Sequence, residues 1–161
     1  LGVGISSKSE LVEIAFDRPL CTEEQERFSH SMPEGFGILN YCENEKKSPF
    51  AALEWAAYEI CITTPISQKR LEDFMKQEEI LMLKRSKKGE KQVNIRPMVQ
   101  CLELVPWENA TVLKAVLKAG QPSLKPELLL QALEQYMQGC ALEVQSVCRT
   151  ALLDGNGQPV A

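Results

Sequence analysis

Basic side chains gather in one short stretch of the chain, and these are the residues whose types and spacing suggest chemistry. Six of the 18 lysines and arginines lie between residues 84 and 96, with one acidic residue, Glu90, among them. The stretch carries a local charge of +5, whereas the rest of the 161-residue chain has 12 basic and 21 acidic residues. Such a local excess of cations in an acidic body favours a phosphate contact over a general nucleic-acid coat. The candidate binding residues are Lys84, Arg85, Lys87, Lys88, Gly89, Lys91, Asn94 and Arg96.

The element expected to position these residues is a β-hairpin within residues 80–105. An apolar run at 80–83 precedes the basic residues, and Val93 and Ile95 alternate with polar residues after them. Two β-rich runs separated by a short polar segment that contains Gly predict a hairpin. Gly89 suits the left-handed position of a bulged turn, because glycine has no Cβ. A charged tip that only keeps an edge strand from aggregating is the alternative interpretation.

The sequence has few residues in patterns that support metal binding or nucleophilic catalysis. The six cysteines, at 21, 42, 61, 101, 140 and 148, form no Cys-x-x-Cys pair, and His30 is the one histidine. This supply argues against a zinc ribbon and against a Ser or Cys nucleophile activated by histidine. No phosphate-binding or dinucleotide-binding glycine motif is present. We therefore expect no catalytic residue and no metal site, and we expect reduced cysteines packed as small apolar side chains.

The composition is that of an ordinary soluble domain, with 44% hydrophobic and 25% charged residues. No apolar run approaches the roughly 18 residues of a membrane span, and no signal-peptide pattern is present. We expect a cytoplasmic protein without membrane contact. Because the first residue is Leu1 and not Met, we also expect that a segment precedes it.

The remaining pattern predicts an α+β protein with mainly antiparallel sheets and helices on one face. Alternating apolar residues predict strands at 10–16, 36–42, 58–63 and 141–153. Helical spacing and capping residues predict helices at 23–31, from 65 onward, and at 126–137. Residues 111–118 fit a strand or a helix, and local signals slightly favour the helix. From residue 58 onward the order approximates a ferredoxin-like module with an extra strand.

Several segments together resemble a bacterial family of unknown function, the radical SAM-linked (radical SAM-associated) domain. The hairpin carries the most specific part of the resemblance, in Lys87-Lys-Gly89 followed by Val93-Asn-Ile-Arg-Pro97. The family often has Asp where this chain has Asn94. Weaker matches are Leu1-Gly-Val-Gly4 to Glu10, Leu20 with Pro33-Glu-Gly35, Tyr58-Glu-Ile60, and Ala119-Gly120 to Lys125-Pro-Glu-Leu-Leu129.

The resemblance implies an organisation into tandem ferredoxin-like units. Residues 1–46 would be the second half of an incomplete first unit, with a strand-helix-strand order, and residues 47–161 the second unit with the basic hairpin. A preceding segment or an oligomer partner would then cover residues 10–42. The family pattern also favours a strand at 111–118, and we adopt that assignment.

The resemblance further implies a radical SAM protein as partner, fused or separate. That partner would carry an iron–sulfur cluster, S-adenosylmethionine and, in cobalamin-binding members, cobalamin. This chain has no Cys-x-x-x-Cys-x-x-Cys motif with which to hold the cluster, so we expect no cofactor of its own.

Three functional hypotheses follow. The first is a non-catalytic accessory or substrate-binding module of a radical SAM system that binds RNA through the basic hairpin. The second is a protein-interaction domain that docks on a radical SAM partner. The third is an enzyme with an unrecognised site on a scaffold distantly similar to RNA-modifying pseudouridine synthases.

Overall fold

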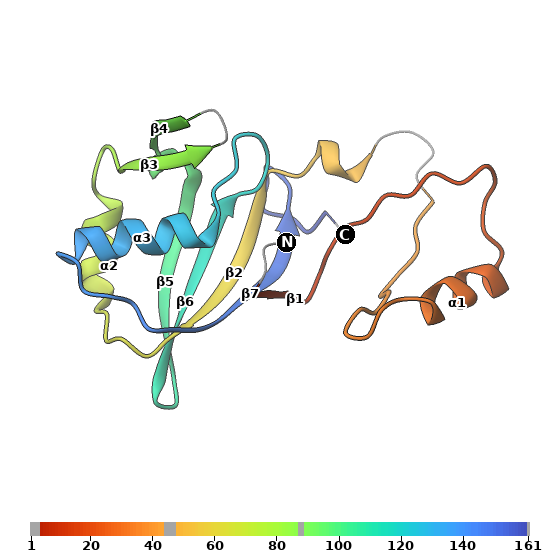
Figure 1. Ribbon diagram of the computed structural model, residues 1–161, viewed down its shortest axis with the longest axis horizontal. Coiled ribbons are helices and arrows are strands. Elements are labelled where there is room, and N and C mark those ends of the chain that lie inside the picture. Colours follow the sequence, from red (N-terminus) through yellow and green to blue (C-terminus); the bar gives the residue numbers. More distant parts are fainter. Residues whose placement is uncertain (1–3, 44–47, 87–88, 161) are drawn as a thin grey trace.

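The computed structural model describes residues 4–43, 48–86 and 89–160. In this part of the chain, a five-stranded sheet has the spatial order β1-β7-β2-β6-β5, and a two-stranded sheet consists of β3 and β4 (Figure 1). The strands are β1 (Ile5–Ser7), β2 (Trp55–Ile62), β3 (Leu81–Ser86), β4 (Gly89–Asn94), β5 (Val99–Trp107), β6 (Ala110–Lys118) and β7 (Val144–Leu153). The helices are α1 (Thr22–His30), α2 (Gln68–Met75) and α3 (Pro126–Tyr136), with 3-10 turns at Pro49–Ala51 and Arg96–Met98.

The larger sheet has ferredoxin-like topology. Neighbouring strands among β7, β2, β6 and β5 are all antiparallel, α2 follows β2, and α3 connects β6 to β7. This is the split β-α-β arrangement of ferredoxin-like folds, here with the β3–β4 hairpin inserted between α2 and β5. Strand β1 extends the sheet beyond β7 and runs parallel to it. The predicted α+β class with a mainly antiparallel sheet is confirmed.

The core lies between one face of the large sheet and the helices α2 and α3, which lie on the same side of it (Figure 1). In β2, buried residues alternate with half-buried ones, so one side of the strand faces the helices. The aromatic rings of Phe74 in α2 and Tyr136 in α3 meet edge to face, with centroids 5.5 Å apart. The buried side chains include Tyr58 and Ile60 from β2, Leu71 and Phe74 from α2, and Leu129 and Leu133 from α3.

Strand β6 resolves the ambiguity at residues 111–118 in favour of the strand. Its backbone pairs with β2 on one side and with β5 on the other. Leu113, Ala115 and Leu117 are buried on the helix-covered face, as alternation requires. A central strand gains main-chain hydrogen bonds along both edges, and these outweigh a slight local preference for helix.

The structure corrects the expectation of strand-helix-strand for residues 1–46. The helix is confirmed as α1, but residues 10–16 and 36–42 form no strand, so both of those predictions are wrong. Their apolar residues alternate as a half-buried strand requires, yet Val12 is 74% exposed and Leu39 is 81% exposed. No other described segment pairs with this backbone, and an unpaired strand is not stable in water.

Helix α1 begins one residue earlier than its sequence pattern predicts. The prediction of 23–31 places the N-cap at Thr22, but Cys21 occupies the N-cap position. The Cys21 backbone N–H donates to the Glu24 carboxylate at 3.1 Å, and the Arg18 guanidinium binds the same carboxylate. These hydrogen bonds lower the pKa of Glu24 to about 2, so the N-terminus of the helix keeps a negative charge that suits its dipole.

Candidate nucleic-acid interface

The β3–β4 hairpin is separate from the large sheet and projects from the end of the molecule where β5 begins (Figure 1). Its register pairs Leu81 with Asn94 and continues to Ser86 with Gly89. Gly89 has a φ of +116°, so the prediction of a positive φ at this glycine is confirmed. An added Cβ at Gly89 would meet no atom within 4 Å, which means that backbone conformation and not space requires glycine there. Lys87 and Lys88 lie outside the described residues.

The hairpin places two of the predicted lysines directly opposite each other. Lys84 of β3 pairs with Lys91 of β4, and both side chains are exposed. Side chains of directly opposed residues lie on the same face with Cβ atoms about 4.5–5.5 Å apart, and like charges in this position are destabilising. Among the described residues neither lysine forms an ion pair. An anion between the two ammonium groups would remove this repulsion.

Arg85 occupies the next position of β3, opposite Glu90 in β4. The Glu90 residue has an interaction partner and is not free. Successive residues of a strand point to opposite faces, so Glu90 lies on the face away from the lysine pair. The exposed leucines Leu81 and Leu83 share that second face. The lysine pair therefore offers positive charge that has no acidic partner among the described residues.

Asn94 and Arg96 lie at the root of the hairpin and hold it to the fold. The Asn94 Oδ1 atom accepts hydrogen bonds from the backbone N–H groups of Ile80 and Arg96, both at 3.0 Å. The half-buried Arg96 donates from Nε to the Met75 carbonyl at 2.8 Å and from Nη1 to the Val99 carbonyl at 3.1 Å. These two predicted binding residues thus contact the main chain, and in this structure they position the hairpin.

The eight predicted residues therefore fall into three places. Lys84, Arg85, Gly89 and Lys91 lie along the two strands, whereas Asn94 and Arg96 lie at the root. The sequence places these residues in one element but does not reveal that Lys84 faces Lys91, because that depends on the register. Nor does it reveal that the Arg96 guanidinium reaches back to α2, which ends 21 residues earlier in the chain.

Two further features bear on the expected chemistry. Within residues 4–43, 48–86 and 89–160, no three His, Cys, Asp or Glu side chains are grouped closely enough to hold a metal ion. In the same residues, no helix has both the length and the apolar character needed to cross a membrane. His30 lies on α1, where its Nδ1 is 2.7 Å from the Glu26 carbonyl.

The fold and the site together define a ferredoxin-like α+β protein with an inserted basic hairpin. The chain belongs to the family described as "Uncharacterized protein conserved in bacteria (DUF2344)", which matches residues 1–126. That description names no reaction and no partner. No curated protein matches the chain significantly.

One similar solved structure is the "Crystal Structure of a Cbf5-Nop10-Gar1 Complex", with a TM-score of 0.43 and 14% sequence identity. The match covers 63% of this chain and 31% of that one, so the chain spans about a third of the length of the protein that it matches.

Proposed function

We propose that this protein is a non-catalytic, substrate-binding module of a radical SAM system and that its β3–β4 hairpin binds RNA. The observation that carries the proposal is the pair of exposed lysines, Lys84 and Lys91, held opposite each other without an acidic partner among the described residues. The link to a radical SAM system rests on the sequence resemblance of the hairpin, from Lys87 to Pro97. The iron–sulfur cluster, S-adenosylmethionine and any cobalamin would belong to the partner.

Electrostatics favours RNA over an uncharged ligand at this place. Two ammonium groups at a cross-strand spacing can contact one phosphate or two successive phosphates, and each contact releases counterions. The rest of the chain is acidic, so RNA would be repelled from the body and confined to the hairpin. Since Asn94 and Arg96 fix the hairpin root, the lysines are presented on a held element rather than on a loose loop.

The test is a binding titration of a fluorescently labelled tRNA at several salt concentrations. The variant Lys84→Glu/Lys91→Glu is expected to weaken binding at least about tenfold at low salt. It should also reduce the slope of log K against log salt by roughly 1.5, since each lost phosphate contact contributes about 0.7 to 0.9. The matched control is Lys69→Glu/Arg70→Glu, which makes the same charge change at two exposed positions in α2.

Equal weakening in both double variants would mean that RNA responds to net charge alone and would refute the hairpin as the interface. Unchanged affinity in the hairpin variant would refute it as well. Charge reversal at Lys87 and Lys88, two of the predicted binding residues, extends the test to the remainder of the basic run.

Protein docking is a second candidate function, and exposed apolar side chains in residues 10–42 favour it. Phe36 is 70% exposed, and Val12 and Leu39 are exposed to a similar degree. Exposed apolar side chains mark a protein interface where they form a contiguous patch, and these three residues lie within one segment, residues 12–39. A preceding segment, an oligomer partner or the radical SAM protein would cover them.

Co-purification separates the two functions. If docking uses residues 10–42, Phe36→Asp/Leu39→Asp should abolish co-purification with the radical SAM protein, whereas Lys84→Glu/Lys91→Glu should not. The opposite pattern would assign the docking surface to the hairpin.

A further inference from the structure

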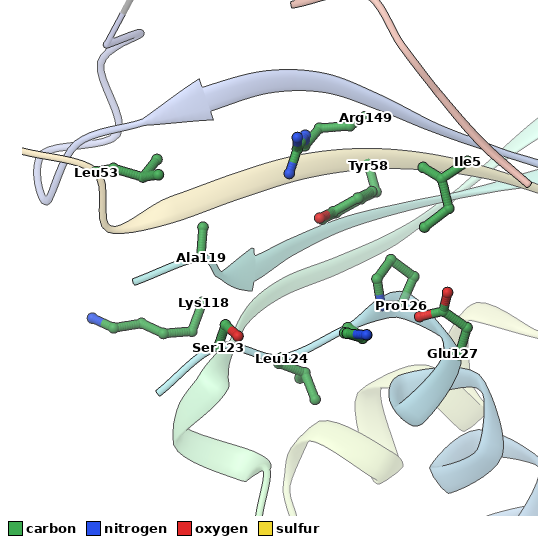
Figure 2. A pocket seen from close by; sticks show the side chains of 11 residues that line it. Ile5, Leu53, Tyr58, Lys118, Ala119, Ser123, Leu124, Pro126, Glu127 and Arg149 are labelled. Atoms are coloured by element: carbon green, nitrogen blue, oxygen red, sulfur yellow. The ribbon is translucent and has the colours of Figure 1, made fainter. Parts of the chain in front are cut away.

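A cavity of about 330 Å³ lies between the start of α3 and the strands β1, β2 and β7 (Figure 2). None of its lining residues belongs to the β3–β4 hairpin. Pockets of roughly this size and above commonly hold small organic ligands. Ile5, Leu53 and Leu124 supply apolar wall. The polar groups come from four separate elements, which is why no spacing in the sequence points to them.

The phenol of Tyr58 projects into this cavity from β2 (Figure 2), although the residue as a whole is only 7% exposed. Burial raises the pKa of Tyr58 and outweighs a hydrogen bond and a charge from Arg149 that lower it. The phenol is therefore protonated at neutral pH and can donate a hydrogen bond to an anion.

Arg149 lies beside Tyr58, on the neighbouring strand β7. Its Nε donates to the Glu10 carboxylate at 2.8 Å, and its Nη2 contacts the second oxygen of the same carboxylate. Burial lowers the pKa of Arg149, but the hydrogen bond and charge of Glu10 raise it further than burial lowers it. Glu10 and the Tyr58 phenol thus hold a charged guanidinium beside the cavity.

Two lysines complete the cationic lining. Lys118, at the end of β6, pairs with Glu54, and its ammonium lies 4.7 Å from the Trp55 ring centroid. Lys125 is the N-cap residue of α3 and forms no side-chain cap, because an ammonium group cannot accept a hydrogen bond. The first turn of α3 therefore presents its positive end next to Lys125, with the hydroxyl of Ser123 close by in the lining.

Two of the three cations in the lining are already paired, Arg149 with Glu10 and Lys118 with Glu54. Among the described residues, Lys125 and the N-terminus of α3 therefore supply the positive charge that no carboxylate pairs with directly. The donors approach from the sheet on one side and from the 118–127 segment on the other (Figure 2). A tetrahedral phosphate with several oxygens can satisfy donors from different directions, whereas a planar carboxylate presents two oxygens in one plane.

We propose that this cavity binds a phosphate monoester carried on a small apolar group. Tyr58, Arg149, Ser123 and Lys125 would contact the phosphate, and the apolar wall would contact the rest of the ligand. This site is separate from the hairpin and does not depend on RNA binding there.

The experiment is a titration of the isotope-labelled full chain with phenyl phosphate, followed by amide NMR shifts, with phenol, benzoate and inorganic phosphate as comparison probes. Saturable shifts at residues around Tyr58 and Leu124 are expected with phenyl phosphate. Inorganic phosphate should bind more weakly because it lacks the apolar group, and phenol should bind more weakly because it lacks the charge.

Two conservative variants test the named contacts without removing core volume. Lys125→Gln and Tyr58→Phe should each weaken phenyl phosphate binding about ten- to hundredfold, as loss of one hydrogen bond to a charged group predicts. The matched control Lys69→Gln removes an exposed lysine from the first turn of α2 and should leave binding unchanged.

Three outcomes would overturn the proposal. One is the absence of saturable shifts up to about 10 mM phenyl phosphate, a concentration that corresponds to less than ~3 kcal/mol of binding. Another is equal affinity in both variants and the wild type. Tighter binding of benzoate than of phenyl phosphate would assign the cavity to carboxylates instead.

Discussion

Replacement of Asn94 by alanine is expected to unlock the hairpin from the fold. The Asn94 Oδ1 atom accepts from the backbone N–H groups of Ile80 and Arg96, each at 3.0 Å, and alanine removes this shared acceptor from both donors. A buried donor left without a partner costs about 1–3 kcal/mol. Because this site is only part-buried and water can replace some of the loss, we take about 1 kcal/mol for each N–H and expect a total near 2 kcal/mol.

Urea denaturation measures this loss. With an m-value of about 1–3 kcal/mol/M, the midpoint should fall by roughly 1 M. The matched control is Asn94→Asp, which keeps an acceptor oxygen at the same place and makes charge-assisted bonds. Its free energy of unfolding should therefore stay within about 0.5 kcal/mol of the wild type or rise. Hydrogen exchange at the Ile80 and Arg96 amides reports on the hairpin root directly, in case the hairpin opens without global unfolding.

A midpoint for Asn94→Ala within about 0.2 M of the wild type, with unchanged amide protection at Ile80 and Arg96, would refute the structural role. Asn94 would then be available as a ligand contact, as its place among the predicted binding residues suggested. If instead the alanine variant loses stability but its folded form binds RNA as tightly as the wild type, then Asn94 holds the hairpin in position and does not itself contact RNA.

Two further predictions concern the core and the pH dependence of stability. Phe74 is fully buried against Tyr136, so Phe74→Ala should cost about 3–5 kcal/mol of unfolding free energy, measured by thermal or urea denaturation, whereas Phe74→Leu should cost much less. Burial alone would raise the pKa of Glu10, but the hydrogen bonds and charge of its partners, Arg149 foremost, bring it below its ordinary value of 4.5. The stabilisation from this carboxylate is therefore complete above pH 4.5 and is lost as the pH falls through the lower folded-state value. Hence the stability difference between the wild type and Glu10→Gln should be constant above pH 4.5 and shrink as the pH falls below it, and a difference that stays constant in acid would contradict the ion pair.

Local sequence patterns were sufficient to predict those elements whose capping, turn or spacing residues lie within the element itself. Helix α3 has Pro at its first position and apolar residues at helical spacing, and it was predicted to within a residue of its observed end. The hairpin and its positive-φ glycine were also predictable, because a turn that needs glycine and two β-rich arms are local features. The basic stretch as a candidate site was likewise visible in the charge distribution alone.

The tertiary structure decided what depends on partners. Residues 111–118 form a strand because β2 and β5 flank them and pair with their backbone. Residues 10–16 have an equally regular alternation of apolar and polar residues, but no other described segment lies in position to pair with them, and they form no strand. Alternation specifies a face but supplies no hydrogen-bond partner, and only pairing stabilises a strand. Register likewise placed Lys84 opposite Lys91, and topology gathered Tyr58, Arg149 and Lys125 around one cavity. Residue types are written in the sequence, but distances between segments far apart in the chain exist only in the folded protein.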